Sequence, residues 1–419
     1  MSDVLKRRAE DARARAYATP LDKFHVGDSE LFRSDTLWPW FERLRKEDPV
    51  HFTAQSEFGP YWSVTKHRDI VAVDSNHRVF SSDSEIGGIT IEEGRQPREQ
   101  SSFISLDPPA HDQQRKVIAP MFGPDSLKIL EPLIRTRAAK ILDELPVGET
   151  FDFVDKVAIE LTSQMLATLF DFPFEQRRLL PRASDLILTK PGPGGLVATE
   201  EQRQVEFFQI FSIFTKLWDE RLAKAPTHDL ISMLCHNEAT RRDRPDQYLG
   251  NVVLLLVAGS DTTRHSITGG LLALNENPEA YDKLRADPAL IASMVPEIIR
   301  WQSPVAHMRR TALCDAQIGG KTIREGEKVI MWYVSGNRDE DAIDRPDEFV
   351  IDRERPRQHV SFGFGIHRCV GMRLAEMQLR IMWEEILRRF PRIEVVGEPR
   401  RMNSNFVKGF EAMPVRIAM

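Results

Sequence analysis

The chain has 419 residues, 41% of them hydrophobic and 29% charged, which is the composition of an ordinary globular protein. Its formal net charge of −6 argues against a nucleic-acid-binding protein. Three cysteines are too few for a disulfide framework and favour a reducing, cytoplasmic location.

The sequence predicts neither a signal peptide nor a membrane anchor. The residues at the N-terminus alternate in charge and lack an apolar core. The longest apolar run, 252–259, is much shorter than the ~20 residues of a membrane span. Length alone would allow two or three domains of about 150 residues each. Because no linker or internal repeat divides the chain, we expect a single domain over 1–419, with a flexible, solvated helix at about 1–20.

The first part of the chain is predicted to form helices and one pair of strands. Two strands, 50–53 and 61–64, are expected on either side of a Gly59-Pro60 turn. Hydrophobic periodicity predicts helices over 37–47, 66–73, 127–145 and 156–170.

Two regions of the sequence interrupt this helical pattern. The first, 81–102, is a loop to which Ile86, Ile89 and Ile91 would give an apolar inner face, and an ordinary polar surface loop is the alternative. The second, 191–195, is rich in proline and glycine and breaks a helical region. The helix expected over 207–222 after it carries several aromatic residues, most of which should pack in the core.

Asp107 and the two prolines that follow it predict the start of a helix. His111 and Arg115 lie four residues apart on one face of this helix. Two cations on one face repel each other unless an anion lies nearby. Taken alone, the pair indicates a solvated helix face, and binding of an anionic group is the alternative.

A long helix is predicted over 246–275, with the sequence AGSDTT at 258–263 in its middle. A glycine inside a helix costs about 1 kcal/mol relative to alanine, so Gly259 needs a reason. The Thr262 hydroxyl can bond the carbonyl one turn back and open the helix locally. Asp261 is a titratable group in an otherwise apolar helix, which makes it a candidate for proton transfer. A helix kink without chemistry is the alternative, but it does not account for the acid.

Glu297 and Arg300 lie three residues apart on a predicted helix over 288–301, so their charges can pair. Exposed pairs of this kind are common and stabilise a protein little.

Adjacent strand residues point to opposite faces, so only one of Arg309 and Arg310 can face a given ligand. The residues 318–323 and 328–333 alternate like strands around a turn, and a hairpin tip is predicted over Phe406–Gly409.

The most specific pattern is FGFGIHRCVG at 362–371. It places Cys369 in a glycine-punctuated loop, and apolar residues at helical spacing follow from Val370 to Phe390, where Pro391 ends the helix. The partial positive charge at a helix N-terminus favours a thiolate over a thiol. A lone thiolate presented in this way suits one role well, that of axial ligand to a haem iron.

Two other interpretations of a single cysteine exist. A buried cysteine is usually a small hydrophobe without a function, which is what we expect of Cys235 and Cys314. A nucleophilic cysteine needs a partnered base, which this loop does not supply. The full pattern F-x-x-G-x-[RH]-x-C-x-G around Cys369 resembles the haem-thiolate monooxygenases of the cytochrome P-450 superfamily, and the resemblance covers nearly the whole chain.

This resemblance implies the fold and the cofactor. The cytochrome P-450 fold is a triangular, single-domain, mainly α architecture with small β-sheets, and the cofactor is haem b, iron protoporphyrin IX. Cys369 would be the metal ligand, and Asp261 and Thr262 would pass protons from solvent toward dioxygen, for which Gly259 would leave room. The R-x-A spacing favours Arg310 over Arg309 at a haem propionate. The residues implied to bind haem are His111, Arg115, Gly259, Arg310, Phe362, Gly365, His367, Cys369 and Gly371.

Roles away from the metal are implied as well. The superfamily buries Glu297 and Arg300 with a third residue, whose best match is Arg353, as a structural lock. The region 81–102 would fold over the substrate, and a mobile lid would lie near 181–214. The residues implied to line an apolar substrate pocket are Ile89, Leu254, Val257, Ala258, Val305 and Phe406.

Stretches such as GPYWSVTKHRDI and VPEIIRWQSPVAHMRRTA are similar to the soluble bacterial alkane and fatty-acid terminal (omega) hydroxylases. This implies insertion of one oxygen atom of O₂ into a terminal C–H bond of a medium-chain alkane or fatty acid by a monomeric enzyme. Because no fused flavin reductase is expected, electrons would come from NAD(P)H through a ferredoxin reductase and an iron–sulfur ferredoxin. Arg115, Lys116, Arg368 and Arg373 could form a ferredoxin docking patch, or be ordinary surface charges.

Three alternatives to a terminal hydroxylase stay open. A hydroxylase of steroids or terpenoids would perform the same reaction on another substrate. A peroxide-driven haem-thiolate enzyme is the second, although relatives of that kind replace the acid–alcohol pair Asp261-Thr262. A haem-based gas sensor is the third, and it would be expected to carry an effector domain, which the sequence does not show.

Overall fold

The computed structural model describes residues 3–94, 101–189, 191–192, 196–241 and 245–418. The chain forms two compact units, each described here by itself. The first unit comprises Met1–Gln96, Gly269–Cys369 and Arg400–Glu411, and the second comprises Pro97–Thr268, Val370–Pro399 and Ala412–Met419. Within the described ranges helices predominate and the strands form four small sheets, so the predicted mainly helical class is confirmed.

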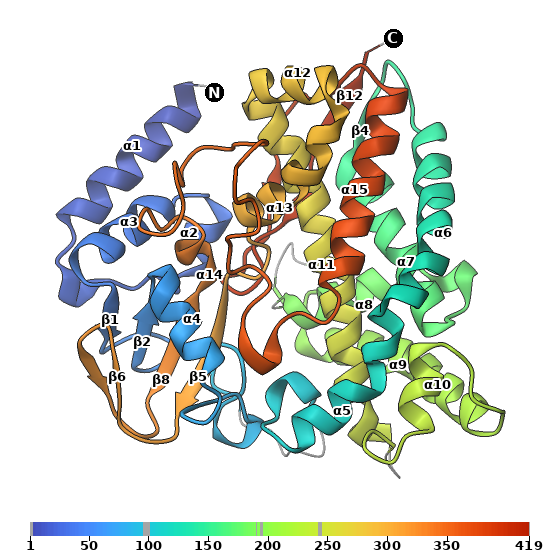
Figure 1. Cartoon of the computed structure of the whole chain (residues 1–419), viewed down its shortest axis with the longest axis horizontal. Coiled ribbons are helices and arrows are strands. Elements are labelled where there is room, and N and C mark those ends of the chain that lie inside the picture. The colour runs from blue at the N-terminus through green and yellow to red at the C-terminus, as the bar shows by residue number, and fades with distance from the viewer. Residues whose placement is uncertain (1–2, 95–100, 190, 193–195, 242–244, 419) are drawn as a thin grey trace. The chain divides into compact units, whose positions relative to one another are not determined.

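A five-stranded sheet is the main β-element of the first unit (Figure 1). Its strand order is β1 (Val50–Thr53), β2 (Tyr61–Val64), β8 (Lys328–Trp332), β5 (His307–Ala312) and β3 (Phe80–Ser81). Of the pairings in this sheet only β2–β8 is parallel. The strands predicted on either side of the Gly59-Pro60 turn are confirmed.

Two hairpins complete the β-structure of the first unit. The first joins β6 (Ala316–Ile318) and β7 (Lys321–Ile323) through two glycines with positive φ angles. The second pairs β10 (Arg400–Arg401) with β11 (Phe410–Ala412), and the predicted tip Phe406–Gly409 lies in the connection between them.

The helices of the first unit pack around aromatic side chains. Phe32, Phe41 and Trp332 are buried together in one cluster, with ring centroids 5.2 to 6.5 Å apart. The helices are α1 (Asp3–Ala18), α2 (Ser29–Arg33), α3 (Trp38–Glu47), α4 (His67–Ser75), α12 (Pro278–Ala286), α13 (Ile291–Gln302) and α14 (Tyr333–Gly336). Short 3₁₀ turns lie at Leu21–Lys23, Ser84–Ile86, Pro288–Leu290 and Gly365–His367.

The N-terminal helix α1 is more firmly attached than a solvated segment would be. Ala12 and Ala16 are fully buried, and Arg13 forms an ion pair of 2.5 Å with Glu42 of α3. The polar side chains of α1 from Arg7 onward are exposed or partly exposed, which is why the sequence shows so little apolar patterning there.

The second unit is built almost entirely of helices. Its three-stranded sheet joins β4 (Thr150–Asp152), β12 (Pro414–Ile417) and β9 (Ile393–Val395). The helix α11 (Pro245–Glu276) begins in this unit and ends in the first. The other helices are α5 (Ala110–Ile118), α6 (Pro124–Asp143), α7 (Glu160–Phe170), α8 (Leu179–Leu188), α9 (Glu200–Leu222), α10 (Leu230–Cys235) and α15 (Met372–Arg389). Short 3₁₀ turns lie at Phe103–Ser105, Ala119–Phe122 and Phe174–Gln176, and a π-helical segment, Val154–Ile159, leads into α7.

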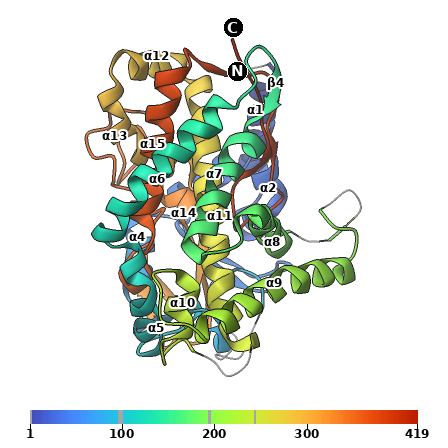
Figure 2. The ribbon, with the colours of Figure 1, turned by 90° about the vertical axis from the view of Figure 1, so that its right-hand side faces the viewer.

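Ion pairs connect α6 to α15, the helix that follows the cysteine loop in the sequence. Arg135 of α6 contacts Glu384 at 2.5 Å and Glu385 at 2.9 Å, and Arg389 of α15 contacts Asp143 at 2.6 Å. The two helices lie side by side in both views (Figures 1 and 2).

The structure differs from the prediction at the start of α9. The helix begins at Glu200, well before the predicted start at 207, and the Thr199 side chain accepts a hydrogen bond from the Gln202 backbone to cap it. The first turns are polar, so apolar periodicity does not reveal them. The predicted break at 191–195 lies partly outside the described residues.

No helix in the described parts of the chain combines the length and the apolar character that crossing a bilayer requires.

Candidate functional site

The cysteine loop is closed by its own backbone. The Cys369 N–H donates to the carbonyl of Phe362 at 2.8 Å, and Cys369 itself is exposed. Gly363 and Gly365 have φ angles of +67° and +64°, a region that side chains rarely tolerate. Gly371 precedes Met372, the first residue of α15. The loop therefore presents one thiol from a rigid turn, just before a helix begins.

His367, which the resemblance places at a haem propionate, is half-buried in the same loop. Its Nε2 lies 2.9 Å from the Ser82 hydroxyl, in the segment that follows β3. This contact brings the start of the segment expected to cover the substrate against the cysteine loop within the first unit.

The two adjacent arginines of β5 point to opposite faces of the sheet, as the strand geometry predicts. Arg310 is committed to an internal ion pair: its Nη2 donates to Asp74 Oδ1 at 2.7 Å, and its Nη1 donates to the Arg309 carbonyl at 2.8 Å. Arg309 lies under the loop Ile86–Glu93, where its guanidinium is 3.5 Å from the Glu93 carboxylate. The two candidates thus lie on opposite faces of the sheet, and Arg310 is paired with the buried carboxylate of Asp74.

His307 joins the apolar loop to the C-terminal hairpin. Its Nδ1 donates to the carbonyl of Asn405 at 2.9 Å, and its Nε2 accepts from the N–H of Ile91 at 3.1 Å. Complete burial lowers the pKa of His307 to about 4, so the ring is neutral near pH 7. Ile89 and Phe406, two predicted pocket residues, lie beside these two anchors, and Phe406 is stacked edge-on against the His307 ring at 5.4 Å.

In α11 the Thr262 hydroxyl donates to the carbonyl of Ala258 at 2.8 Å, which is the local contact that the sequence predicts. Asp261 beside it is fully buried. Its carboxylate accepts hydrogen bonds from Ser184 of α8 and from Arg264, and Arg264 also contacts Asp185 at 2.9 Å. Neither Ser184 nor Asp185 was expected, whereas the i,i+3 spacing of Asp261 and Arg264 is visible in the sequence.

The surroundings of Asp261 make it a weaker acid than usual. Burial in the apolar interior raises the pKa of Asp261 to about 6, with the Asp185 charge acting in the same direction and Arg264 opposing both. A carboxyl group with a pKa near neutrality can both give and take a proton at physiological pH.

The reason for Gly259 is helix packing. A Cβ at this position would lie 2.8 Å from Leu166 Cδ2 of α7, so the room that the glycine leaves is filled by a leucine. The structure thus gives Gly259 a packing reason, because a side chain there would point at α7, and the room for dioxygen stays a prediction.

The face of α11 around Thr262 is apolar yet uncovered. Ala258 is exposed, and Leu254, Val257 and Thr262 are only partly buried, whereas Leu256 in the same helix is fully buried. In the first unit, the predicted pocket residues Ile89, Val305 and Phe406 are partly exposed in the same way. Within the first unit, an exposed thiol together with apolar side chains that protein does not cover fits a flat apolar cofactor held by a single cysteine. The residues present therefore fit haem.

On α5, His111 is buried and its Nδ1 lies 2.8 Å from Asp112 Oδ1. Burial is the largest cause that lowers the pKa of His111, and the charge of Arg115 lowers it further. Arg115 is partly exposed on the same helix. An anion beside the pair would favour the protonated histidine.

The structure joins Glu297, Arg300 and Arg353 in one buried cluster of the first unit. Arg300 donates two hydrogen bonds of 2.7 Å to the Glu297 carboxylate, and Arg353 adds two of 2.9 and 3.1 Å. These contacts outweigh burial and lower the pKa of Glu297. The structure thus joins the three residues that the resemblance implies to form a buried cluster, and the structural role stays a prediction.

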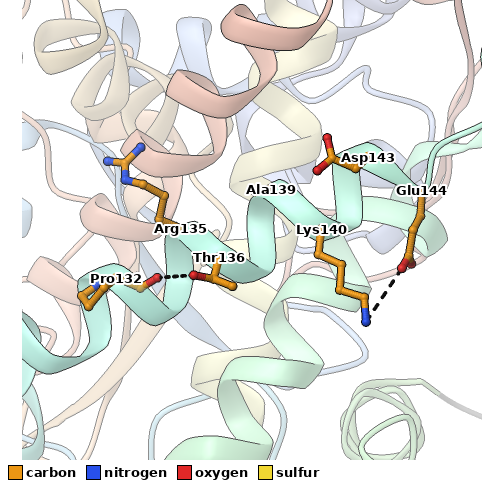
Figure 3. A pocket seen from close by; sticks show the side chains of 7 residues that line it. All are labelled: Pro132, Arg135, Thr136, Ala139, Lys140, Asp143 and Glu144. Carbon is orange, nitrogen blue, oxygen red and sulfur yellow. Dashed lines mark hydrogen bonds and ion pairs between the residues drawn. The ribbon is translucent and has the colours of Figure 1, made fainter.

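A hollow on the surface of α6 is separate from these residues (Figure 3). Its charged groups already have partners: Lys140 lies 3.9 Å from Glu144, and Asp143 is paired with Arg389. The hollow holds none of the sequence motifs and is not a candidate site. Its lining residues are Pro132, Arg135, Thr136, Ala139, Lys140, Asp143 and Glu144.

Comparison with known proteins agrees with this geometry. Residues 164–411 match the family described as Cytochrome P450. Linalool 8-monooxygenase of Pseudomonas putida is 37% identical over 94% of this chain and 99% of its own, and the steroid C26-monooxygenase of Mycolicibacterium smegmatis is 34% identical over 88% and 87%. The solved structure of cytochrome P450-153 from Novosphingobium aromaticivorans is 42% identical, covers 94% of this chain and 98% of its own, and superposes with a TM-score of 0.86.

The chain therefore belongs to the cytochrome P450 family. It is a monooxygenase of that family, whose membership implies a haem-thiolate cofactor and electron supply by redox partners.

Proposed function

We propose that this cytochrome P450 hydroxylates the terminal carbon of medium-chain alkanes or fatty acids. The observation that carries the proposal is the 42% identity to cytochrome P450-153 over nearly the whole chain, since that group is an alkane-hydroxylase family. The uncovered residues Leu254, Val257 and Ala258 support it, because they offer an aliphatic chain no polar partner.

Cys369 would bind the haem iron through its sulfur. When bound, haem b supplies the iron at which dioxygen is activated, and a thiolate ligand favours cleavage of the O–O bond. The chain contributes a rigid loop with an exposed thiol, so the sulfur needs little rearrangement to reach the metal.

Thr262 and Asp261 would deliver protons. The Thr262 hydroxyl donates to the Ala258 carbonyl and lies on the uncovered face of α11. The buried carboxyl of Asp261 would take up a proton and pass it on, because its pKa of about 6 permits exchange near neutral pH. Ser184, whose hydroxyl donates to Asp261, and Arg264 keep that carboxyl in place between turnovers.

The haem propionates would be bound by cationic side chains. His111 and Arg115 on α5 and His367 in the cysteine loop are the proposed partners, as the sequence suggests. For the β5 position we propose Arg309 in place of Arg310, because Arg310 neutralises the buried Asp74, whereas the Glu93 carboxylate beside Arg309 is exposed. Arg309 shares a strand face with His307, which anchors two segments proposed to line the pocket.

Terminal selectivity requires that the pocket exclude the carbon next to the chain end. A primary C–H bond is stronger than a secondary one, so selectivity must come from shape. Val305 and Phe406 of the first unit are proposed walls, and each is partly exposed and apolar. The His307 contacts would keep the Phe406 segment in one position.

A ferredoxin, supplied with electrons by an NAD(P)H-dependent reductase, is the proposed redox partner. Lys116, Arg368 and Arg373 are exposed cations, which suits an acidic ferredoxin. Arg115 is partly exposed and is assigned to the propionate instead.

A hydroxylase of terpenoids or steroids is the second candidate. The 37% identity to linalool 8-monooxygenase and the 34% identity to the steroid C26-monooxygenase favour it. A peroxide-driven enzyme is disfavoured by the presence of the acid–alcohol pair Asp261-Thr262.

Product analysis separates these candidates. The holoenzyme, reconstituted with NADH, reductase and ferredoxin, is incubated with octane, a medium-chain fatty acid, linalool and a steroid, and products are identified by mass spectrometry. We expect primary alcohols from octane or the fatty acid, with little product when peroxide replaces NADH. Chiefly subterminal alcohols, or turnover of linalool or the steroid alone, would overturn the proposal.

A further inference from the structure

The buried carboxylate of Asp74 lies against the cysteine loop. Asp74 is at the end of α4 and is 2% exposed. Its Oδ2 accepts hydrogen bonds from the N–H of Phe364 at 2.7 Å and from the hydroxyl of Tyr333 at 2.8 Å. Its Oδ1 accepts from Arg310 at 2.7 Å. Three donors from three segments of the first unit therefore meet on one side chain.

The position of this carboxylate is costly unless those donors are present. A negative charge in the last turn of a helix is disfavoured by the helix dipole, and burial away from water adds to the cost. Arg310 balances the charge, and the Phe364 N–H gives a charge-assisted bond. Burial and the Asp74 charge raise the pKa of Tyr333 well above its usual value, so its hydroxyl stays a donor.

The contact with Asp74 requires glycine at two positions of the cysteine loop. A Cβ on Gly363 would lie 3.1 Å from Asp74 Oδ2, and a Cβ on Gly365 would lie 2.6 Å from the Asp74 carbonyl oxygen. The end of α4 thus packs directly against the loop at Gly363 and Gly365. The same stretch of loop carries Phe362, whose carbonyl accepts the Cys369 N–H at 2.8 Å.

We propose that Asp74 is a positioning residue for the Cys369 thiolate. It fixes Phe364 and the glycines on either side, which set the position of Phe362 and, through its carbonyl, of the Cys369 backbone. Arg310 and Tyr333 act by keeping the Asp74 carboxylate in place. This inference rests on the proposed role of Cys369 as the iron ligand.

A buried carboxylate at the other end of α4 offers a matched control. Asp339 is 1% exposed, pairs with Lys66 at 3.1 Å and accepts the His67 N–H at 2.8 Å. It thus resembles Asp74 in burial and in kind of partner, but its contacts hold the start of the helix. Replacing either residue should destabilise the protein, and only Asp74 should affect the thiolate.

The test compares the holoproteins of wild type, Asp74→Ala and Asp339→Asn as ferrous carbon monoxide complexes. The readout is the rate at which the red-shifted absorbance of thiolate ligation is lost, each variant being held at the same interval below its own melting temperature. We expect roughly tenfold faster loss in Asp74→Ala, as the removal of a buried charged acceptor implies, and an unchanged rate in Asp339→Asn. Equal rates in the two variants would overturn the proposal.

Milder variants decide the question if Asp74→Ala does not retain haem. Asp74→Asn keeps an oxygen for Phe364 and Tyr333 but loses the pair with Arg310, and Tyr333→Phe removes a single donor. Both should lose the band faster than Asp339→Asn, and a rate equal to that of the control contradicts the inference. A wild-type protein that never shows the band contradicts the proposed role of Cys369 instead, which keeps the two failures distinguishable.

Discussion

The guanidinium of Arg300 and the carboxylate of Glu297 form a bidentate pair, with two hydrogen bonds of 2.7 Å between side chains that are both fully buried. The other donors of Arg300 reach the carbonyls of Asn337, Pro346 and Glu348. Each buried charge therefore depends on the other. Breaking such a pair leaves an uncompensated charge in the interior.

Glu297→Gln should lower the free energy of unfolding by about 3–5 kcal/mol, because it leaves Arg300 without its counter-charge. Urea denaturation followed by circular dichroism measures the change. Glu200→Gln is the control, since Glu200 and Arg203 form an exposed pair at the same i,i+3 spacing. The control should leave the free energy of unfolding nearly unchanged, because exposed pairs stabilise a protein little. Similar decreases in the free energy of unfolding in the two variants would show that the buried pair stabilises the protein no more than the exposed pair does.

Thr262→Ala should reduce the yield of hydroxylated product per NADH consumed and increase hydrogen peroxide, because the proposed proton donor is lost. General acid catalysis contributes about 10²–10⁴-fold, so product formation should fall within that range. Thr268→Ala is the control, because its hydroxyl makes the same kind of bond to the backbone of α11, to Arg264 O at 3.0 Å, in a buried position. An equal yield of hydroxylated product per NADH in the two variants would argue against a chemical role for Thr262.

The stability of the protein should fall between pH 6.5 and pH 4 in a way that depends on His307. Its pKa in the folded protein is about 4, below the usual 6.5, so the unfolded chain binds the proton first as the pH falls. The stabilisation is complete above the unfolded pKa, and about 3 kcal/mol is lost by the lower end of this window.

His307→Gln removes this titration and should flatten the dependence of the unfolding free energy on pH by about 2–3 kcal/mol between these limits. Denaturation curves at several pH values provide the measurement. A variant that retains the wild-type slope would mean that other groups account for it.

Arg309→Met should weaken haem binding more than Arg310→Met does. A charge-assisted bond to a propionate is worth about 1.5–3 kcal/mol, so haem transfer to excess apomyoglobin should be roughly tenfold faster or more. Arg310→Met should leave haem retention closer to wild type and lower stability, because its partner is the buried Asp74. Faster haem transfer from Arg310→Met than from Arg309→Met would instead indicate Arg310 as the propionate partner.

The sequence was most informative where contacts are local. The bond from Thr262 to the Ala258 carbonyl depends on the helix geometry alone, so spacing predicts it. The Glu297–Arg300 pair is local in the same sense, although its burial is not. Among the described residues, strands and helices with clear periodicity appear where they were predicted, whereas the polar start of α9 at Glu200 has no apolar pattern to reveal it.

Contacts between distant segments could not be predicted from one sequence. Asp74 meets Arg310 and Phe364 across 236 and 290 residues, and nothing in the sequence around Asp74 signals the contact. Ser184 reaches Asp261 across 77 residues. The reason for Gly259 likewise depends on Leu166 of another helix.

The bond between the Cys369 sulfur and a haem iron is the claim on which the other proposals depend. Purified, pigmented protein is reduced with dithionite and exposed to carbon monoxide, and its absorbance spectrum is recorded. We predict the red-shifted band of a thiolate-ligated haem in the wild type and its loss in Cys369→His. A folded, haem-containing wild-type protein without that band would contradict the account.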